Sequence, residues 1–73
     1  MNTITLQFVI REHTFVLRFP PTSEGETRAY FAVAAWRLQG LVSGHWDCAA
    51  MLYAIRDAVD DWQDEQHVTE RMG

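Results

Sequence analysis

The chain has 73 residues, a formal net charge of −4 and one cysteine, Cys48, and this combination excludes several classes of protein. A lone cysteine cannot form an internal disulfide or a multi-cysteine zinc site, and an acidic chain without a basic stripe is a poor candidate for binding DNA or RNA directly. So short a chain forms a single domain with a small core, and we expect it to gain stability by associating with another protein chain.

The apolar segments of the chain are short. The N-terminal sequence MNTITLQF lacks the basic segment and the continuous apolar core of a signal peptide. The longest uninterrupted apolar runs, residues 29–36 and 48–55, contain eight residues each. A membrane-spanning helix needs roughly 20. These features predict a cytoplasmic protein that is not inserted in a membrane.

Residues 3–19 alternate between apolar and polar side chains, which is the pattern of a hairpin of two half-buried β-strands. Pairing Phe8 with Phe15 places every large apolar group on one face, because side chains alternate along a strand. The same register pairs Leu6 with Leu17 and Ile4 with Phe19. Because Arg11-Glu12 lacks the Gly or Asn that a tight turn prefers, we expect a four-residue loop from Ile10 to His13 rather than a two-residue loop.

The next segment predicts a helix over about residues 24–39. Pro20-Pro21 ends the second strand, since proline cannot donate to the ladder. Ser23 and Glu26 match a capping box at the start of the helix, and Gly40 is well placed as its left-handed stop.

The apolar residues of this first helix lie on nearly all of its sides, so it must be covered nearly all round. One hairpin and one further helix cannot provide that cover. We therefore expect a homodimer that completes the fold. The residues predicted to form its interface are Tyr30, Ala32, Val33 and Trp36.

A second helix is predicted over about residues 45–66, with a frayed tail at 67–73. Its apolar stripe has spacings of four and three residues, which marks one face of a helix. The opposite side is apolar in its first half and acidic in its second half. The stripe consists of Cys48, Leu52, Ile55, Val59 and Trp62.

The acidic residues are concentrated at the end of the chain. Residues 57–73 hold six acids and one Arg, whereas residues 1–56 hold four acids and five Arg. The C-terminal end of a helix disfavours negative charge, so these acids lie against the local electrostatics. This position favours a role in steering the protein towards a basic partner; the alternative is that the acids only maintain solubility. The predicted partner-binding residues are Asp57, Asp60, Asp61, Trp62, Asp64 and Glu65.

No motif in the chain predicts a reaction. The segment DDWQD, residues 60–64, resembles the magnesium-binding motif of prenyl-diphosphate synthases, which implies cation binding by its three aspartates. This chain is too short to supply the large helical bundle of those enzymes, so a solvated acidic face is the simpler interpretation. The pair Asp64–His67 is spaced like a carboxylate–histidine pair of di-iron bundles, but it stands at the expected fraying end of the helix without the second pair and further Glu residues of those bundles. The pair His45–Cys48 has no third ligand nearby in the sequence, and Cys48 falls on the apolar stripe. We predict no catalytic residue, no metal ion and no cofactor.

These observations predict an α+β fold in the order ββαα, an antiparallel hairpin followed by two antiparallel helices. The expected function is that of a protein–protein interaction module that binds and blocks a host or partner protein, as inhibitors from phages and mobile elements do. The alternative is a regulatory or accessory subunit of a native cytoplasmic complex. The classes of target expected for such an inhibitor are a host motor, a regulator and a nucleic-acid-binding defence complex. For a nucleic-acid-binding target, the acidic helix would stand in for the phosphate backbone.

Overall fold

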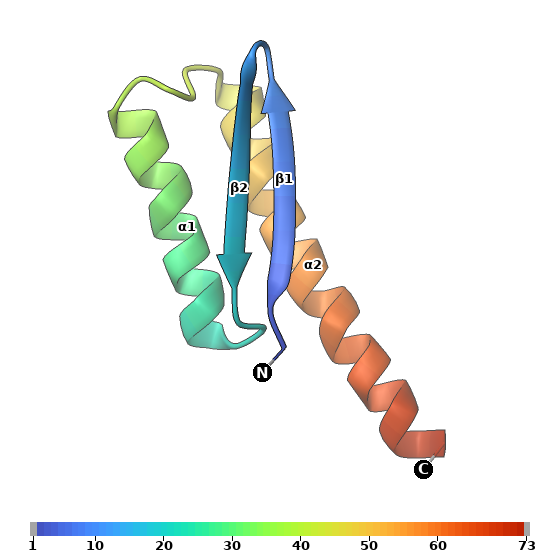
Figure 1. The fold of residues 1–73 in the computed structure, drawn as a ribbon. Helices are drawn as coiled ribbons and strands as arrows, with labels where there is room; N and C mark the ends of the chain where they lie inside the picture. Colours follow the sequence, from blue (N-terminus) through green and yellow to red (C-terminus); the bar gives the residue numbers. More distant parts are fainter. Residues whose placement is uncertain (1, 73) are drawn as a thin grey trace.

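A computed structural model of the chain describes the backbone of residues 2–72 and the side chains of residues 2–65. Two antiparallel strands, β1 (Ile4–Ile10) and β2 (His13–Phe19), precede two helices, α1 (Ser23–Leu38) and α2 (His45–Met72). The fold is therefore α+β with the predicted ββαα order. The hairpin lies across one side of the helix pair, with β2 against α1 and β1 against α2 (Figure 1).

The register of the hairpin is the predicted one, but its loop is not. Phe8 lies opposite Phe15, and the pairing continues to Ile10 and His13 at the tip. The loop therefore has two residues, Arg11 and Glu12, and the predicted four-residue loop is wrong. Arg11 has a φ of 58°, which the first position of a tight primed turn requires. Pairing of the strands up to their ends outweighs the cost of about 1–2 kcal/mol for a non-glycine residue in this conformation.

The start of α1 differs from the prediction by one residue. The N-cap is Thr22, whose Oγ1 accepts a hydrogen bond from the Gly25 amide over 3.1 Å. The predicted Ser23–Glu26 capping box is therefore wrong. The Glu26 side chain instead binds groups on Tyr30 and α2, where it gains a cationic partner that the helix start does not offer.

The end of α1 confirms the predicted role of Gly40, which has a φ of 78°. The Gly40 amide donates to the Arg37 carbonyl over 3.0 Å, and the Leu41 amide donates to the Trp36 carbonyl over 2.9 Å. These two bonds form a Schellman motif, which satisfies the last carbonyl groups of the helix. The chain then turns towards α2.

The core lies between the hairpin and the helix pair. The inward residues of β2 are buried, whereas those of β1 are half-buried. On α2, the buried stripe includes Met51 in place of the predicted Leu52, which is 37% exposed. The reason is that the hairpin covers the Met51 side of the helix, while Leu52 lies about 100° further round its axis. The buried apolar residues are Phe15, Leu17, Phe19, Ala29, Val33, Val42, Cys48, Met51, Ile55 and Val59.

The second helix is longer than predicted. It continues to Met72, past the expected end near residue 66, and it projects beyond the hairpin and α1 in Figure 1. The chain accordingly measures 46 × 20 × 18 Å. The tail predicted to fray, residues 67–73, has side chains outside the described residues, and its fraying stays a prediction.

Candidate protein-binding surfaces

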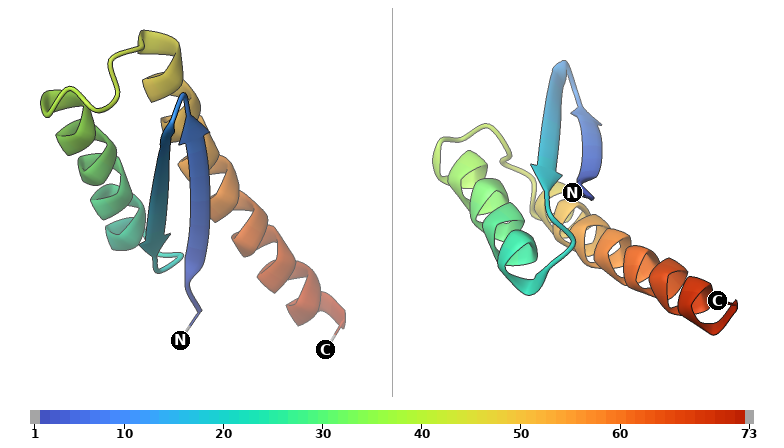
Figure 2. Two further views of the ribbon diagram at one scale, coloured as in Figure 1. Left: turned by 45° about the horizontal axis from the view of Figure 1, so that its top comes forward. Right: turned by 60° about the horizontal axis from the view of Figure 1, so that its bottom comes forward.

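The hairpin covers one side of the helix pair and leaves the other side bare (Figure 2). Residues of α1 and α2 together line an open, mostly apolar groove. It consists of two adjacent hollows of about 780 and 400 Å³, and both are lined by Tyr30 and Leu52. We refer to this surface as the helix groove. It is defined by Tyr30, Phe31, Ala34, Leu38, Leu52 and Tyr53.

The large side chains of the helix groove are strongly exposed. Leu38 is 89% exposed, Tyr53 72% and Phe31 70%. Burial of a large apolar side chain typically contributes about 1.5–3 kcal/mol. The groove therefore exposes apolar surface whose burial would be favourable.

The charges at the helix groove are positive, although the protein as a whole is acidic. Arg37 lines one hollow and Arg56 the other, and no carboxylate is among the residues that line either hollow. Arg37 is exposed, and Arg56, which is 59% exposed, is paired with carboxylates beside the groove.

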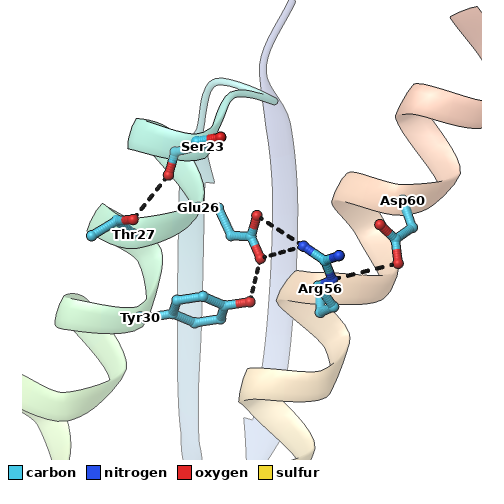
Figure 3. Close-up of polar contacts among 6 residues, drawn as sticks. All are labelled: Ser23, Glu26, Thr27, Tyr30, Arg56 and Asp60. Carbon is cyan, nitrogen blue, oxygen red and sulfur yellow. Dashed lines mark hydrogen bonds and ion pairs between the residues drawn. The ribbon is translucent and has the colours of Figure 1, made fainter.

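A polar network ties the two helices together beside the groove (Figure 3). The Arg56 Nη1 donates to the Glu26 carboxylate over 3.2 Å, and the Tyr30 hydroxyl donates to the same carboxylate. The Arg56 Nε also lies 3.6 Å from an Asp60 carboxylate oxygen.

The network changes the acidity of its members. The hydrogen bond from Tyr30, followed by the hydrogen bond and positive charge of Arg56, lowers the pKa of Glu26 against the opposing effect of desolvation. The carboxylate in turn raises the pKa of the Tyr30 hydroxyl. At neutral pH the network therefore stabilises Glu26 in its ionised form and Tyr30 in its neutral form. We assign the network a structural role.

The predicted acidic surface is partly assembled by the structure. Asp57, Asp61 and Asp64 are exposed, and their spacing places them on the outer side of α2. Asp60 is half-buried and paired with Arg56. We refer to the three exposed aspartates as the acidic face.

Two further predicted partner-binding residues, Trp62 and Glu65, are not part of the acidic face as defined above. Glu65 is exposed and has an interaction of its own. Trp62 is half-buried, and its spacing continues the buried stripe of Ile55 and Val59 rather than the acidic face.

The residues predicted as a dimer interface do not form one open surface. Val33 is 0% exposed, and Ala32 and Trp36 pack against the core. The Trp36 ring centroid lies 4.9 Å from that of Phe15 on β2. Of the four predicted residues, Tyr30 and Val33 line the helix groove, and Val33 lies buried at its floor.

The sequence contained a signal for the open surface that the prediction did not use. Phe31, Ala34 and Leu38 are spaced by three and four residues, so they share one side of α1. Because α1 is apolar on nearly all sides, this row could not be distinguished by sequence from the one that the hairpin covers.

A polar hollow of about 320 Å³ lies at the hairpin tip and includes Ser43, His13 and Asp47. These residue types could form a hydrolytic triad, but no hydrogen bond joins their side chains in the part of the chain that the structure describes. The Cys48 thiol is buried. Among the described residues, no three His, Cys, Asp or Glu side chains gather as a metal site.

No protein-family model, curated protein or solved structure matches this chain. Within residues 2–72, no helix combines the length and the apolar character that crossing a membrane requires.

Proposed function

We propose that this chain is a protein–protein interaction module that binds and blocks a partner protein with a basic surface. The observation that carries the proposal is the acidic face of α2, where Asp57, Asp61 and Asp64 stand exposed along one side of the helix. Because these three side chains are exposed, a large partner can approach the acidic face.

The electrostatics of α2 support this role. Because α2 extends to Met72, the acidic face lies more than two turns before the end of the helix, and the helix dipole, whose effect falls off within the last turn, has little influence on it. Exposed acids contribute little to folding but raise the rate of association with a basic surface, and salt weakens this effect.

The form of the function that we propose is inhibition of a host or partner protein in the cytoplasm, as small inhibitors of phages and mobile elements do. We further propose that the module acts as a homodimer. The helix groove supports a second candidate, an accessory subunit of a native complex, because a bare apolar groove suits a chain that is assembled with others.

The test compares two variants in binding to a partner captured from host cells with the tagged chain and then purified. One variant replaces Asp57, Asp61 and Asp64 with Asn. The control replaces Glu12 and Glu24 with Gln, which removes charge from exposed positions outside the acidic face.

We expect the Asn variant to associate at least about tenfold more slowly at low salt, with a weaker salt dependence, and the control to resemble the wild type. Unchanged association and salt dependence in the Asn variant would contradict the proposal. Capture of a constant partner from the chain's own operon, with no loss of that partner's activity on binding, would favour the accessory subunit.

A further inference from the structure

We infer that the helix groove is a two-fold interface, filled by the helix groove of a second copy of this chain. In this dimer the four helices form a central layer, and one hairpin covers each outer side. The inference specifies, and rests on, the homodimer proposed above. It does not depend on the acidic face or on the identity of a basic partner.

The accessible area of the chain exceeds that of a compact monomer by about the area that one partner buries in a standard interface. The chain exposes 5562 Å², whereas a compact monomer of 8.5 kDa exposes about 4,700 Å². The excess of about 900 Å² compares with the roughly 800 Å² that each partner buries in a standard interface. Part of this excess lies on the end of α2 that projects beyond the hairpin and α1 (Figure 1).

The pattern of side chains in the groove is self-complementary. On α1, Ala34 lies between the two large residues Phe31 and Leu38, at spacings of three and four. On α2, Ala49 lies between Trp46 and Tyr53 at the same spacings. Ala49 and Tyr53 line the groove, and Trp46, which is 82% exposed, lies one turn nearer the start of the helix. A row of this kind pairs with its own antiparallel copy, because the alanines meet at the centre and let the helices approach closely, while large residues meet at both sides.

A single two-fold axis can relate both rows to their copies in the second chain. Ala34 and Cys48 line the same hollow, so Ala34 lies nearly level with Ala49, the neighbour of Cys48. A two-fold axis that passes near Ala34 therefore also passes near Ala49. The contact is isologous and closes after two copies, so it does not lead to open chains of molecules.

Charge is compatible with this arrangement. No carboxylate lines the groove, and one of its two arginines, Arg56, is paired with Glu26 and Asp60 of its own chain. The charge that dimerisation brings into the interface is therefore that of Arg37. Because the two copies of α2 run antiparallel from an axis near Ala49, their acidic halves point in opposite directions. The like-charged acidic faces are thereby separated, and both stay accessible.

The test is the oligomeric state of the purified full chain at micromolar concentration, measured by sedimentation equilibrium. Two variants, Leu38→Asp and Ala34→Glu, place a charge in the groove at exposed positions. The matched control is Val9→Asp, because Val9 is 67% exposed on the outer face of the hairpin. Far-UV circular dichroism verifies that each variant is folded, and Leu38→Gln replaces Leu38→Asp if the latter is not.

A second measurement locates the axis. Ala34→Cys in a Cys48→Ala background places one thiol per chain near the proposed axis, and Val9→Cys in the same background is its control. We expect oxidation to link two chains through position 34 and not through position 9. Equal or greater linking through position 9 overturns the inference.

We expect a wild-type mass of twice 8.5 kDa, with a dissociation constant at least about tenfold higher in the groove variants and unchanged in Val9→Asp. A wild-type monomer at these concentrations overturns both this inference and the homodimer. If the groove variants still form dimers with an unchanged dissociation constant, this inference is overturned, but the proposal of a homodimer is not. Binding to a basic partner is measured separately with the acidic-face variant.

Discussion

The Arg56 guanidinium on α2 donates to the Glu26 carboxylate on α1 over 3.2 Å, although the two residues are 30 positions apart in the sequence. The Glu26 side chain is only 12% exposed, and it also accepts a hydrogen bond from Tyr30 one turn further along α1. This contact sets the level at which the two helices meet. It therefore also determines which residues face each other across the helix groove.

The ionisation of Glu26 predicts a pH-dependent stability. Tyr30 and Arg56 hold the pKa of Glu26 below its ordinary value. A carboxylate with a lowered pKa stabilises the folded state above its unfolded pKa of about 4.3, and this contribution is lost as the pH falls through the folded pKa. We expect Glu26→Gln to reduce the free energy of unfolding by about 1 kcal/mol at neutral pH and by less at about pH 3.

Urea denaturation at the two pH values measures this difference. The control is Glu24→Gln, which removes an exposed ion pair with Arg28 and should change the stability by less than about 0.5 kcal/mol. An equal loss for Glu26→Gln at both pH values would show that its charge does not stabilise the fold.

The N-cap of α1 predicts opposite results at two neighbouring positions. Thr22→Ala removes the acceptor for the Gly25 amide and should cost about 1 kcal/mol. Ser23→Ala should cost little, because Ser23 accepts the Thr27 hydroxyl through its backbone carbonyl, which the substitution retains. Thermal denaturation of the two variants checks the assignment, and a larger loss for Ser23→Ala would return the N-cap to Ser23.

We expect replacement of Gly25 by alanine to change the stability in the direction opposite to that predicted by helix propensity. Alanine is favoured over glycine inside a helix by about 1 kcal/mol. A Cβ at position 25, however, meets the Pro20 carbonyl oxygen at 2.0 Å, and the backbone must shift to accept it. We expect Gly25→Ala to destabilise the protein by about 2 kcal/mol or more. Chemical denaturation decides the sign, and any gain in stability would mean that the contact between Pro20 and α1 is looser than the structure shows.

The hairpin turn predicts a stabilising substitution. Arg11 has a positive φ, which glycine adopts without the steric cost that a Cβ imposes. We expect Arg11→Gly to raise the free energy of unfolding by up to about 1 kcal/mol. Glu12→Gly is the control: position 12 has no positive φ, so glycine there should lower the stability by about 0.5–1 kcal/mol. A loss at position 11 as large as that at position 12 would argue against the two-residue turn.

Features that depend on local chemistry were predictable from the sequence. The register that pairs Phe8 with Phe15 follows from alternation, since a shift of one residue turns a whole strand inside out. Gly40 ends α1 because few other residues adopt a positive φ. The turn and the N-cap were each predicted at the right place, but the loop length and the capping residue were wrong. In both cases several local conformations have similar energies, and the packing of Pro20 and of the strand ends selects one of them.

The tertiary structure alone decided which surfaces are covered. The apolar side chains of α1 surround the helix, so periodicity gave no direction in which its core face should point. The position of the hairpin buries Val33 and leaves Phe31 and Leu38 bare. On α2, the same placement buries Met51 rather than Leu52, two apolar neighbours that the pattern could not rank. Local propensity is a property of a short segment, whereas burial depends on what lies against that segment, and here that neighbour is a hairpin contributed by a distant part of the chain.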